Sequence, residues 1–136
     1  MKRFQAISPL LSLILFAGFA LIVTQSDKQA RAAKIEGTVR YISDGDTLSL
    51  IGHQYPIRLW GIDAPEMSSG AGPSAKAQLN GLVAGGKLTC HRKAVDKYRR
   101  TVAQCFAGEV DISARMIATG HATELCLYSR NAYGTC

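Results

Sequence analysis

The chain begins with an apolar segment of the kind that directs export. Residues 13–23 form an unbroken apolar run of eleven residues, and two basic residues stand near the start of the chain. A polar stretch follows and ends in Ala30-Arg31-Ala32, the small-x-small pattern at which signal peptides are cleaved. The pattern predicts a signal peptide over residues 1–32, with cleavage after Ala32.

An uncleaved membrane anchor is the alternative interpretation of this segment. Residues 7–23 are apolar in character and comprise 17 positions, at the short end of a helical span. In both interpretations residues 33–136 form the exported domain, which we expect to be periplasmic or secreted. With an uncleaved N-terminus the domain would be membrane-anchored and face the exported side.

Beyond residue 33, polar and apolar positions alternate over short stretches that turn residues separate. Leu48 and Leu50, for example, lie two positions apart, as on one face of a strand. In the same way Ile57 and Leu59 alternate with Arg58. The pattern predicts five strands, over residues 34–43, 47–51, 54–62, 87–92 and 100–107.

Two helices are expected among these strands. Pro73 begins an Ala-rich helix over residues 74–84. Asp111 caps a second helix, which extends to Thr119, and the residues after position 121 are expected to form a loop. The order of three strands, a helix, two strands and a helix favours an α+β fold, a five-stranded Greek-key β-barrel of the OB type with helices. A mixed open α+β sheet is the alternative.

Composition agrees with one globular domain and excludes a disordered chain. The 136 residues are 47% hydrophobic and 19% charged. The net charge is +6, but only +3 belongs to residues 33–136, which carry 12 basic and 9 acidic residues. Five of these basic residues fall within residues 92–100, opposed only by Asp96. Such a cluster suits phosphate groups, although a solvated loop would also explain it.

All four cysteines lie in the exported part of the chain. An even number of cysteines in a small exported domain predicts two disulfides, and three pairings are open. The residues concerned are Cys90, Cys105, Cys126 and Cys136. No CxxC pair occurs and the histidines do not have zinc-finger spacing, so a zinc site is not expected.

Several acidic residues fall on predicted turns and strand ends. Asp44 and Asp46 flank a glycine, and Asp63 and Glu66 flank the Ala-Pro pair at positions 64–65. Carboxylates on turns are the oxygen ligands that hard cations such as Ca²⁺ prefer. An isolated Asp-Gly-Asp is also a common hairpin turn. An EF-hand loop is excluded, because position 12 of such a loop holds no acid here.

Arginines accompany these acids in the sequence. Arg58 stands five residues before Asp63, and Arg99 and Arg100 end the basic cluster. Hydrolysis of a phosphodiester needs carboxylates that hold a cation or orient water, and guanidiniums that bind phosphate and stabilise its developing charge. The residue types therefore indicate phosphoryl chemistry.

Three motifs carry a family resemblance. DGDT at 44–47, RLWGIDAPE at 58–66 and DKYRR at 96–100 stand in the order found in staphylococcal nuclease (thermonuclease) proteins, and the chain resembles that family from residue 35 to 122. The resemblance implies an OB-type barrel with helices, and a Ca²⁺-dependent endonuclease that cleaves DNA and RNA. We expect a monomer that prefers single-stranded substrates and meets a membrane only if its N-terminus stays uncleaved. The alternative is a catalytically inactive OB-type module that binds nucleic acid or protein.

The resemblance also implies roles for the acidic residues. The carboxylates of Asp46 and Asp63 match the family's Ca²⁺ ligands, and Ala64 would contribute its backbone carbonyl. Glu66 matches the residue that activates or orients the attacking water.

The basic and aromatic residues match the family's phosphate and substrate contacts. Arg58 and Arg100 correspond to the phosphate clamps. Tyr98 corresponds to a substrate-contacting tyrosine, and Lys97 and Arg99 lie on the same segment. An aromatic ring beside cations suits a flexible single strand.

The chain departs from the family pattern in three ways. Arg99 replaces a glycine, so it would be strained if that position requires a positive φ, or it would add a phosphate contact. The sequence up to Cys136 lacks most of the family's C-terminal helix. The four cysteines are not a family hallmark, and the motif alignment predicts the pairs Cys90–Cys105 and Cys126–Cys136.

Overall fold

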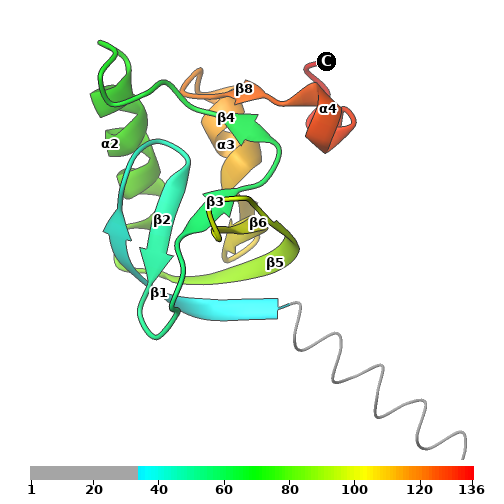
Figure 1. Ribbon diagram of the computed structural model, residues 1–136. Coiled ribbons are helices and arrows are strands. Elements are labelled where there is room, and N and C mark those ends of the chain that lie inside the picture. Colours follow the sequence, from blue (N-terminus) through cyan, green and yellow to red (C-terminus); the bar gives the residue numbers. More distant parts are fainter. Residues whose placement is uncertain (1–33) are drawn as a thin grey trace, which may run out of the picture. The chain divides into compact units, whose positions relative to one another are not determined.

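A computed structural model describes residues 34–136, so the expected signal peptide or anchor at residues 1–32 lies outside the described residues (Figure 1). The helices are α2 (Gly72–Val83), α3 (Ile112–Ala118) and α4 (Cys126–Ser129). The strands are β1 (Lys34–Ile42), β2 (Thr47–Leu50), β3 (Ile57–Leu59), β4 (Ile62–Asp63), β5 (Lys87–Val95), β6 (Thr101–Ala107), β7 (Val110–Asp111) and β8 (Thr123–Glu124). Within this part of the chain no helix is long and apolar enough to cross a membrane.

Five strands close into a barrel. The sheet runs in the order β3-β2-β1-β5-β6-β7, and an additional parallel pairing of β3 with β6 joins its two ends. The other pairings of this sheet are antiparallel. This arrangement confirms the five-stranded OB-type barrel with helices and excludes the open sheet.

The predicted length of the third strand is wrong. The sequence suggests one strand over residues 54–62, whereas the structure has β3 and β4 separated by a turn at Trp60 and Gly61. Gly61 has a φ of 76°, a left-handed value that ends the strand because it turns the backbone. The short β4 then pairs with β8 rather than with the barrel. Arg58 and Asp63 therefore belong to different sheets.

The basic cluster is mostly exposed and divides between the end of β5 and the turn that follows it. β5 extends through Arg92 and Lys93 to Val95, and only residues 96–100 form the turn to β6. The cluster is therefore the end of a β-hairpin, whose backbone is held by pairing between β5 and β6.

The residues after position 121 form an ordered tail rather than a loop. Glu124 organises this tail with four hydrogen bonds. Its Oε1 accepts from Ser129 Oγ at 2.6 Å and from Tyr133 N at 3.0 Å. Its Oε2 accepts from Thr135 N at 2.9 Å and from Thr135 Oγ1 at 2.8 Å. A disulfide between Cys126 and Cys136 closes the same segment. Hydrogen bonds to one carboxylate, that of Glu124, hold this tail together, so the tail shows no hydrophobic periodicity in the sequence.

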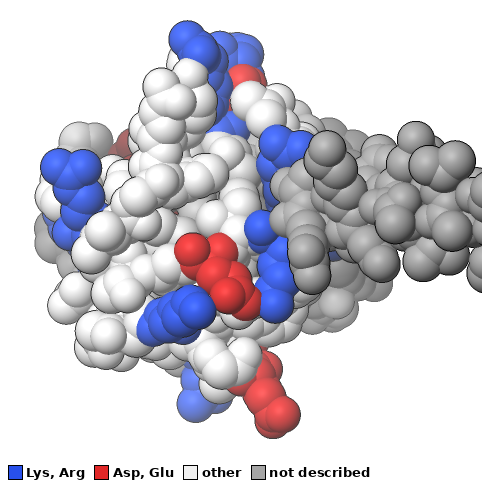
Figure 2. All heavy atoms as spheres, turned by 90° about the horizontal axis from the view of Figure 1, so that it is seen from below, with Lys and Arg blue, Asp and Glu red and all other residues white. Residues whose placement is uncertain are grey.

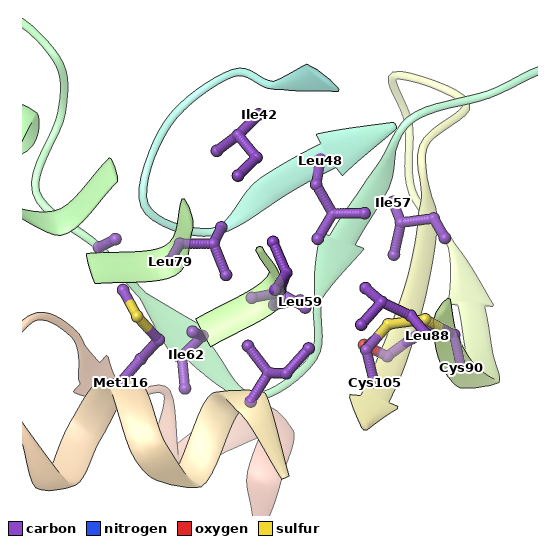
Figure 3. Packing of buried hydrophobic residues seen from close by; sticks show 14 of the residues in the cluster. Ile42, Leu48, Ile57, Leu59, Ile62, Leu79, Leu88, Cys90, Cys105 and Met116 are labelled. Atoms are coloured by element: carbon purple, nitrogen blue, oxygen red, sulfur yellow. A yellow bond between two sulfur atoms is a disulfide. The ribbon is translucent and has the colours of Figure 1, made fainter. Parts of the chain in front are cut away.

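The barrel interior is filled by aliphatic side chains, which α2 and α3 cover (Figure 3). Residues with at most 1% exposure are drawn from every barrel strand except β1 and include Leu48, Leu50, Ile57, Leu59, Leu88 and Cys105. The Cys90–Cys105 disulfide lies in this core and joins directly paired residues of β5 and β6. Both disulfide pairs agree with the sequence prediction.

Two glycines let α2 approach the loops that carry the acidic motifs. A Cβ on Gly45 would lie 2.7 Å from the Cβ atoms of both Ala64 and Ala75. A Cβ on Gly72 would collide with the carbonyl oxygen of Glu66. Real Cβ atoms do not approach rigid neighbours so closely. The DGDT turn therefore packs closely against Ala64 and Ala75, and the start of α2 packs against the backbone of Glu66 and Met67.

This packing predicts opposite effects for two glycine substitutions. Gly45→Ala should lower the free energy of unfolding by about 1–3 kcal/mol, because the new methyl group overpacks the contact with Ala64 and Ala75. Gly81→Ala is the control on α2, since its Cβ would meet nothing within 4 Å. It should raise stability by about 0.5–1 kcal/mol. Urea unfolding of both variants checks this, and equal effects would contradict the packing.

The tail predicts an acid-dependent loss of stability. Desolvation raises the pKa of the Glu124 carboxyl, but its four hydrogen bonds outweigh this and lower the pKa to about 2, from an ordinary value of 4.5. A lowered pKa in the folded state means that the ionised group stabilises the fold above pH 4.5 and loses this effect as the pH falls toward 2. Wild type should therefore exceed Glu124→Gln in unfolding free energy at pH 6, and the difference should shrink on acidification. A difference independent of pH would contradict this role.

Candidate active site

The DGDT turn between β1 and β2 presents one carboxylate toward the protein interior. Asp44 Oδ1 accepts a hydrogen bond from Asp46 N at 3.0 Å, and Ser43 N donates to Thr47 O at 2.9 Å. These bonds fix the turn that an isolated Asp-Gly-Asp predicts. Asp46 itself is only 6% exposed, and Thr47 Oγ1 donates to its Oδ1 at 3.1 Å. The turn therefore does more than reverse the chain.

One guanidinium nitrogen joins the two predicted metal-binding carboxylates. Arg58 Nη2 lies 3.0 Å from Asp46 Oδ2 and 3.0 Å from Asp63 Oδ1. Its Nη1 donates to the carbonyl of Leu59 at 3.2 Å. Ala64 N donates to Asp46 Oδ2 at 2.8 Å. Four of the predicted site residues, from β3, β4 and two connecting segments, thus meet at one place.

The two carboxylates differ in their access to solvent. The Asp46 side chain is 9% exposed, whereas that of Asp63 is 59% exposed. Burial raises the pKa of the Asp46 carboxyl to about 6, against the lowering effects of Arg58 and of the Ala64 N–H, while Asp44 raises it further. One carboxylate is thus fixed from inside the protein, and the other faces solvent.

Glu66 follows Asp63 by three residues, and in the described part of the chain no hydrogen bond or ion pair joins its side chain to the cluster. Its backbone oxygen accepts from Ser69 N at 2.9 Å and Ser69 Oγ at 2.7 Å, which fixes the local loop. Its side chain is exposed, and within residues 34–136 no hydrogen bond or ion pair holds the carboxylate. The structure therefore fixes the backbone of Glu66 and leaves its carboxylate available to water.

Arg100 is held by Asp96 at the β5–β6 turn. Arg100 Nε donates to Asp96 Oδ2 at 2.7 Å, and its backbone N donates to Oδ1 at 2.9 Å. Desolvation raises the pKa of the Asp96 carboxyl, but the hydrogen bonds from Arg100 and Tyr98 N outweigh it and hold the pKa below its usual value. Asp96 thus stays ionised and orients Arg100.

Strand register puts the two predicted phosphate clamps on one face. β3 and β6 are parallel, with Arg58 beside Val102 and Ile57 beside Thr101. Side chains alternate along a strand, and Thr101 points into the protein. Arg100 directly precedes β6, two positions before Val102, so the same alternation directs it to the outer face, and no hydrogen bond or ion pair of the described residues joins it to the cluster of carboxylates.

The predicted substrate contacts lie at the exposed end of the same hairpin. Tyr98 is 67% exposed. Lys97 Nζ lies 5.0 Å from the centre of its ring, and Arg100 Cζ lies 5.4 Å from it. An exposed ring between two cations is able to receive a base and its phosphates.

Arg99 has the backbone conformation that a glycine favours. Its φ is 67°, so the position does require the left-handed region. Its guanidinium hydrogen-bonds to the hydroxyl of Tyr55 and lies 4.8 Å from the centre of that ring. The side chain thus has a partner within the protein, while its predicted contact with phosphate stays a prediction.

Sequence reasoning did not identify the residues that orient the arginines and Asp46. Asp96 and Thr47 stand inside the DKYRR and DGDT motifs, so their place in these motifs is the sequence signal that could identify them. Tyr55 has no such signal, because its contact with Arg99 arises only when β3 and the hairpin are brought together.

The candidate donors for a cation are two carboxylates. Within residues 34–136 no group of three or more His, Cys, Asp or Glu side chains lies close enough together to hold a metal ion by itself. Asp46 and Asp63 instead offer carboxylate oxygens that converge on one positive atom. Oxygen donors of this kind suit Ca²⁺ or Mg²⁺, completed by carbonyl oxygens and water. The carbonyl of Ala64, next to Asp63, remains a predicted ligand.

Positive charge outside this site is distributed over the surface. Figure 2 shows Lys and Arg side chains at several separate places on one face, with acidic side chains between some of them. Lys34 and Lys87 are both paired with Glu36, at 2.7 Å and 3.2 Å. Anion binding must therefore depend on local arrangements of side chains rather than on the net charge.

The fold and site together define a class of protein: an OB-type barrel with paired carboxylates and arginines at one rim. The chain belongs to the staphylococcal nuclease family, because the profile described as "Staphylococcal nuclease homologue" matches residues 56–135.

Individual relatives agree with this family. The chain is 33% identical over 121 residues to an uncharacterized endonuclease of Haemophilus influenzae, covering 87% of this chain and 67% of the relative. It is 33% identical over 81 residues to the probable staphylococcal-like nuclease CAN4 of Oryza sativa subsp. japonica, covering 60% and 16%. It is 41% identical over 76 residues to the probable endonuclease LCL3 of Candida tropicalis, covering 48% and 32%. The chain thus spans between 16% and 67% of the length of these curated relatives.

The backbone at Arg99 predicts a ranking of two variants. Arg99→Gly and Arg99→Ala both remove the contact with Tyr55, but only alanine retains a Cβ at a φ of 67°. The glycine variant should therefore be more stable than the alanine variant by about 1 kcal/mol. Denaturant unfolding of both variants measures the difference. An alanine variant as stable as the glycine variant would show that this turn relaxes without strain.

Proposed function

We propose that the protein is an exported nuclease that hydrolyses phosphodiester bonds in DNA and RNA. The observation that carries the proposal is the convergence of Asp46 and Asp63 on Arg58. We assign Glu66 and Arg100 to the same site on the basis of their motifs. Membership of the family supports it, as do relatives named endonuclease and staphylococcal-like nuclease.

Each residue has a task that its surroundings favour. The unpaired Glu66 carboxylate orients a water molecule and accepts its proton as the oxygen attacks phosphorus in line. Arg58, anchored by the two carboxylates, binds a phosphate oxygen beside them. Arg100, oriented by Asp96, binds a second oxygen as negative charge develops. The bond to the 5′-oxygen breaks, and that oxygen takes up a proton, which leaves a 3′-phosphate.

Ca²⁺ is the cation that we propose for Asp46 and Asp63, with the Ala64 carbonyl as a third ligand. When bound, it would supply positive charge next to the phosphate oxygens. The donor chemistry also suits Mg²⁺ or Mn²⁺, and the proposal of Ca²⁺ follows from the family resemblance.

Single-stranded substrate and export complete the proposal. Tyr98 with Lys97 forms an exposed ring-and-cation pair that suits an unstacked base. Two disulfides are typical of exported domains, which supports the interpretation of residues 1–32 as an export signal. The protein would act as a monomer in the periplasm or outside the cell.

An inactive OB-type binding module is the second candidate. It is favoured by the fact that both proposed phosphate clamps are bound to carboxylates of their own chain, Arg58 to Asp46 and Asp63, and Arg100 to Asp96. In an active enzyme these ion pairs must leave guanidinium N–H groups free for phosphate. In a module they would serve stability alone.

Substitution of Glu66 separates the two candidates. Glu66→Gln keeps the size of an exposed side chain and should lower kcat on single-stranded DNA by about 10²–10³ in the presence of Ca²⁺. Arg100→Gln should cause a loss of similar size. Glu109→Gln and Arg115→Gln are matched controls at exposed positions outside the site and should retain wild-type rates. Near wild-type turnover of Glu66→Gln would contradict the proposed chemistry.

A further inference from the structure

We propose that the groove between β1 and α2 binds the substrate strand as it leaves the reacting phosphate. This inference rests on the proposed function and deepens it by assigning a second nucleotide-binding surface. The groove has a volume of about 550 Å³, and its walls include Arg40, Tyr41, Met67, Lys76 and Asn80.

A β-bulge builds one wall of this groove. The register between β1 and β2 shifts between Val39 and Tyr41, so one residue is inserted on the β1 side. The regular alternation of exposed and half-buried positions breaks there, and Arg40 and Tyr41 are both exposed. Bulges re-aim side chains in this way and are common beside functional sites. Here the bulge puts a cation and an aromatic ring on the same groove.

The groove is basic and aromatic, with no acid to neutralise it. Lys76 Nζ lies 5.2 Å from the centre of the Tyr41 ring, which is 59% exposed. Of the ion pairs within residues 34–136, none includes Arg40 or Lys76. Among the described residues, none that lines the groove is acidic, and α2 contains no acid. Two free cations beside a ring are the elements that bind phosphates and a base of a single strand.

The walls of the groove neighbour the motifs of the candidate active site in the chain. Met67 follows Glu66 directly, and it is 41% exposed. Lys76 follows Ala75, against which Gly45 of the DGDT turn is packed. β1 leads through Ile42 into that same turn. We therefore expect a strand whose phosphate is bound at Arg58 to reach the groove past the DGDT turn or Met67.

Nucleic acid is the occupant that this chemistry favours. A purely apolar partner would leave two cations without counter-charges, and an acidic peptide would not use the exposed ring. OB-type domains bind about 4–16 nucleotides of single strand, more than a single phosphate-binding site contacts. The groove would extend the contact by one or two nucleotides.

Binding without cleavage tests the groove. The full disulfide-bonded chain is titrated with a fluorescent 12-nucleotide single-stranded DNA in chelator, over a series of salt concentrations. Arg40→Gln and Lys76→Gln should each reduce the magnitude of the slope of log K against log salt by about 0.7. Tyr41→Ser should weaken binding about fivefold or more, from loss of stacking. Arg115→Gln, which removes an exposed cation from α3, should change neither quantity.

The outcomes distinguish the groove from the proposed function. Wild-type affinity and salt dependence in all three groove variants would overturn the groove, as would a wild-type protein that does not bind the strand. With Ca²⁺ present, the groove variants should lose more kcat/KM on the 12-nucleotide strand than on a dinucleotide, and equal losses on both would also overturn it. A wild-type protein that binds through Arg40 and Lys76 but cleaves no substrate would refute the nuclease and retain the groove.

Discussion

The guanidinium of Arg58 joins three segments at one rim of the barrel. It contacts the DGDT turn through Asp46 and the short strand β4 through Asp63, while Arg58 itself belongs to the barrel strand β3. Asp46 is buried and its pKa is raised, so a positive partner is needed to keep this carboxylate ionised inside the protein. The arrangement stabilises the rim and holds two carboxylates ready for a further cation.

The rest of the domain maintains this arrangement. Parallel pairing of β3 with β6 closes the barrel and puts Arg100 on the same outer face as Arg58. α2 packs against the DGDT turn at Gly45, so the position of Asp46 depends on that helix. β8 pairs with β4, and the Glu124-centred tail follows β8, which links the C-terminal segment to Asp63. Stability and chemistry therefore share the same contacts.

Strand alternation and an N-cap, which are local signals, predict the barrel and the helices α2 and α3. The disulfide pairs and the identity of the clustered residues follow from the family resemblance that the three motifs carry. Asp111 caps α3, as predicted, by accepting from Ala114 N at 3.1 Å. The break at Gly61 was missed because Ile62 continues the apolar run of β3. The structure of the tail is not predicted, because Glu124 organises it by side-chain hydrogen bonds, which produce no hydrophobic periodicity in the sequence. The contact of Arg99 with Tyr55 depends on packing between distant segments, which no pattern encodes.

Cleavage of single-stranded DNA by the disulfide-bonded wild-type protein, with Ca²⁺ and with excess chelator, tests the central claim most directly. The account predicts cleavage with Ca²⁺ that yields 3′-phosphate ends and stops in chelator, because the carboxylates on Arg58 need a cation to complete the site. Folded protein that binds Ca²⁺ and DNA but leaves the strand intact would contradict the account. Cleavage at an undiminished rate in chelator would contradict it equally.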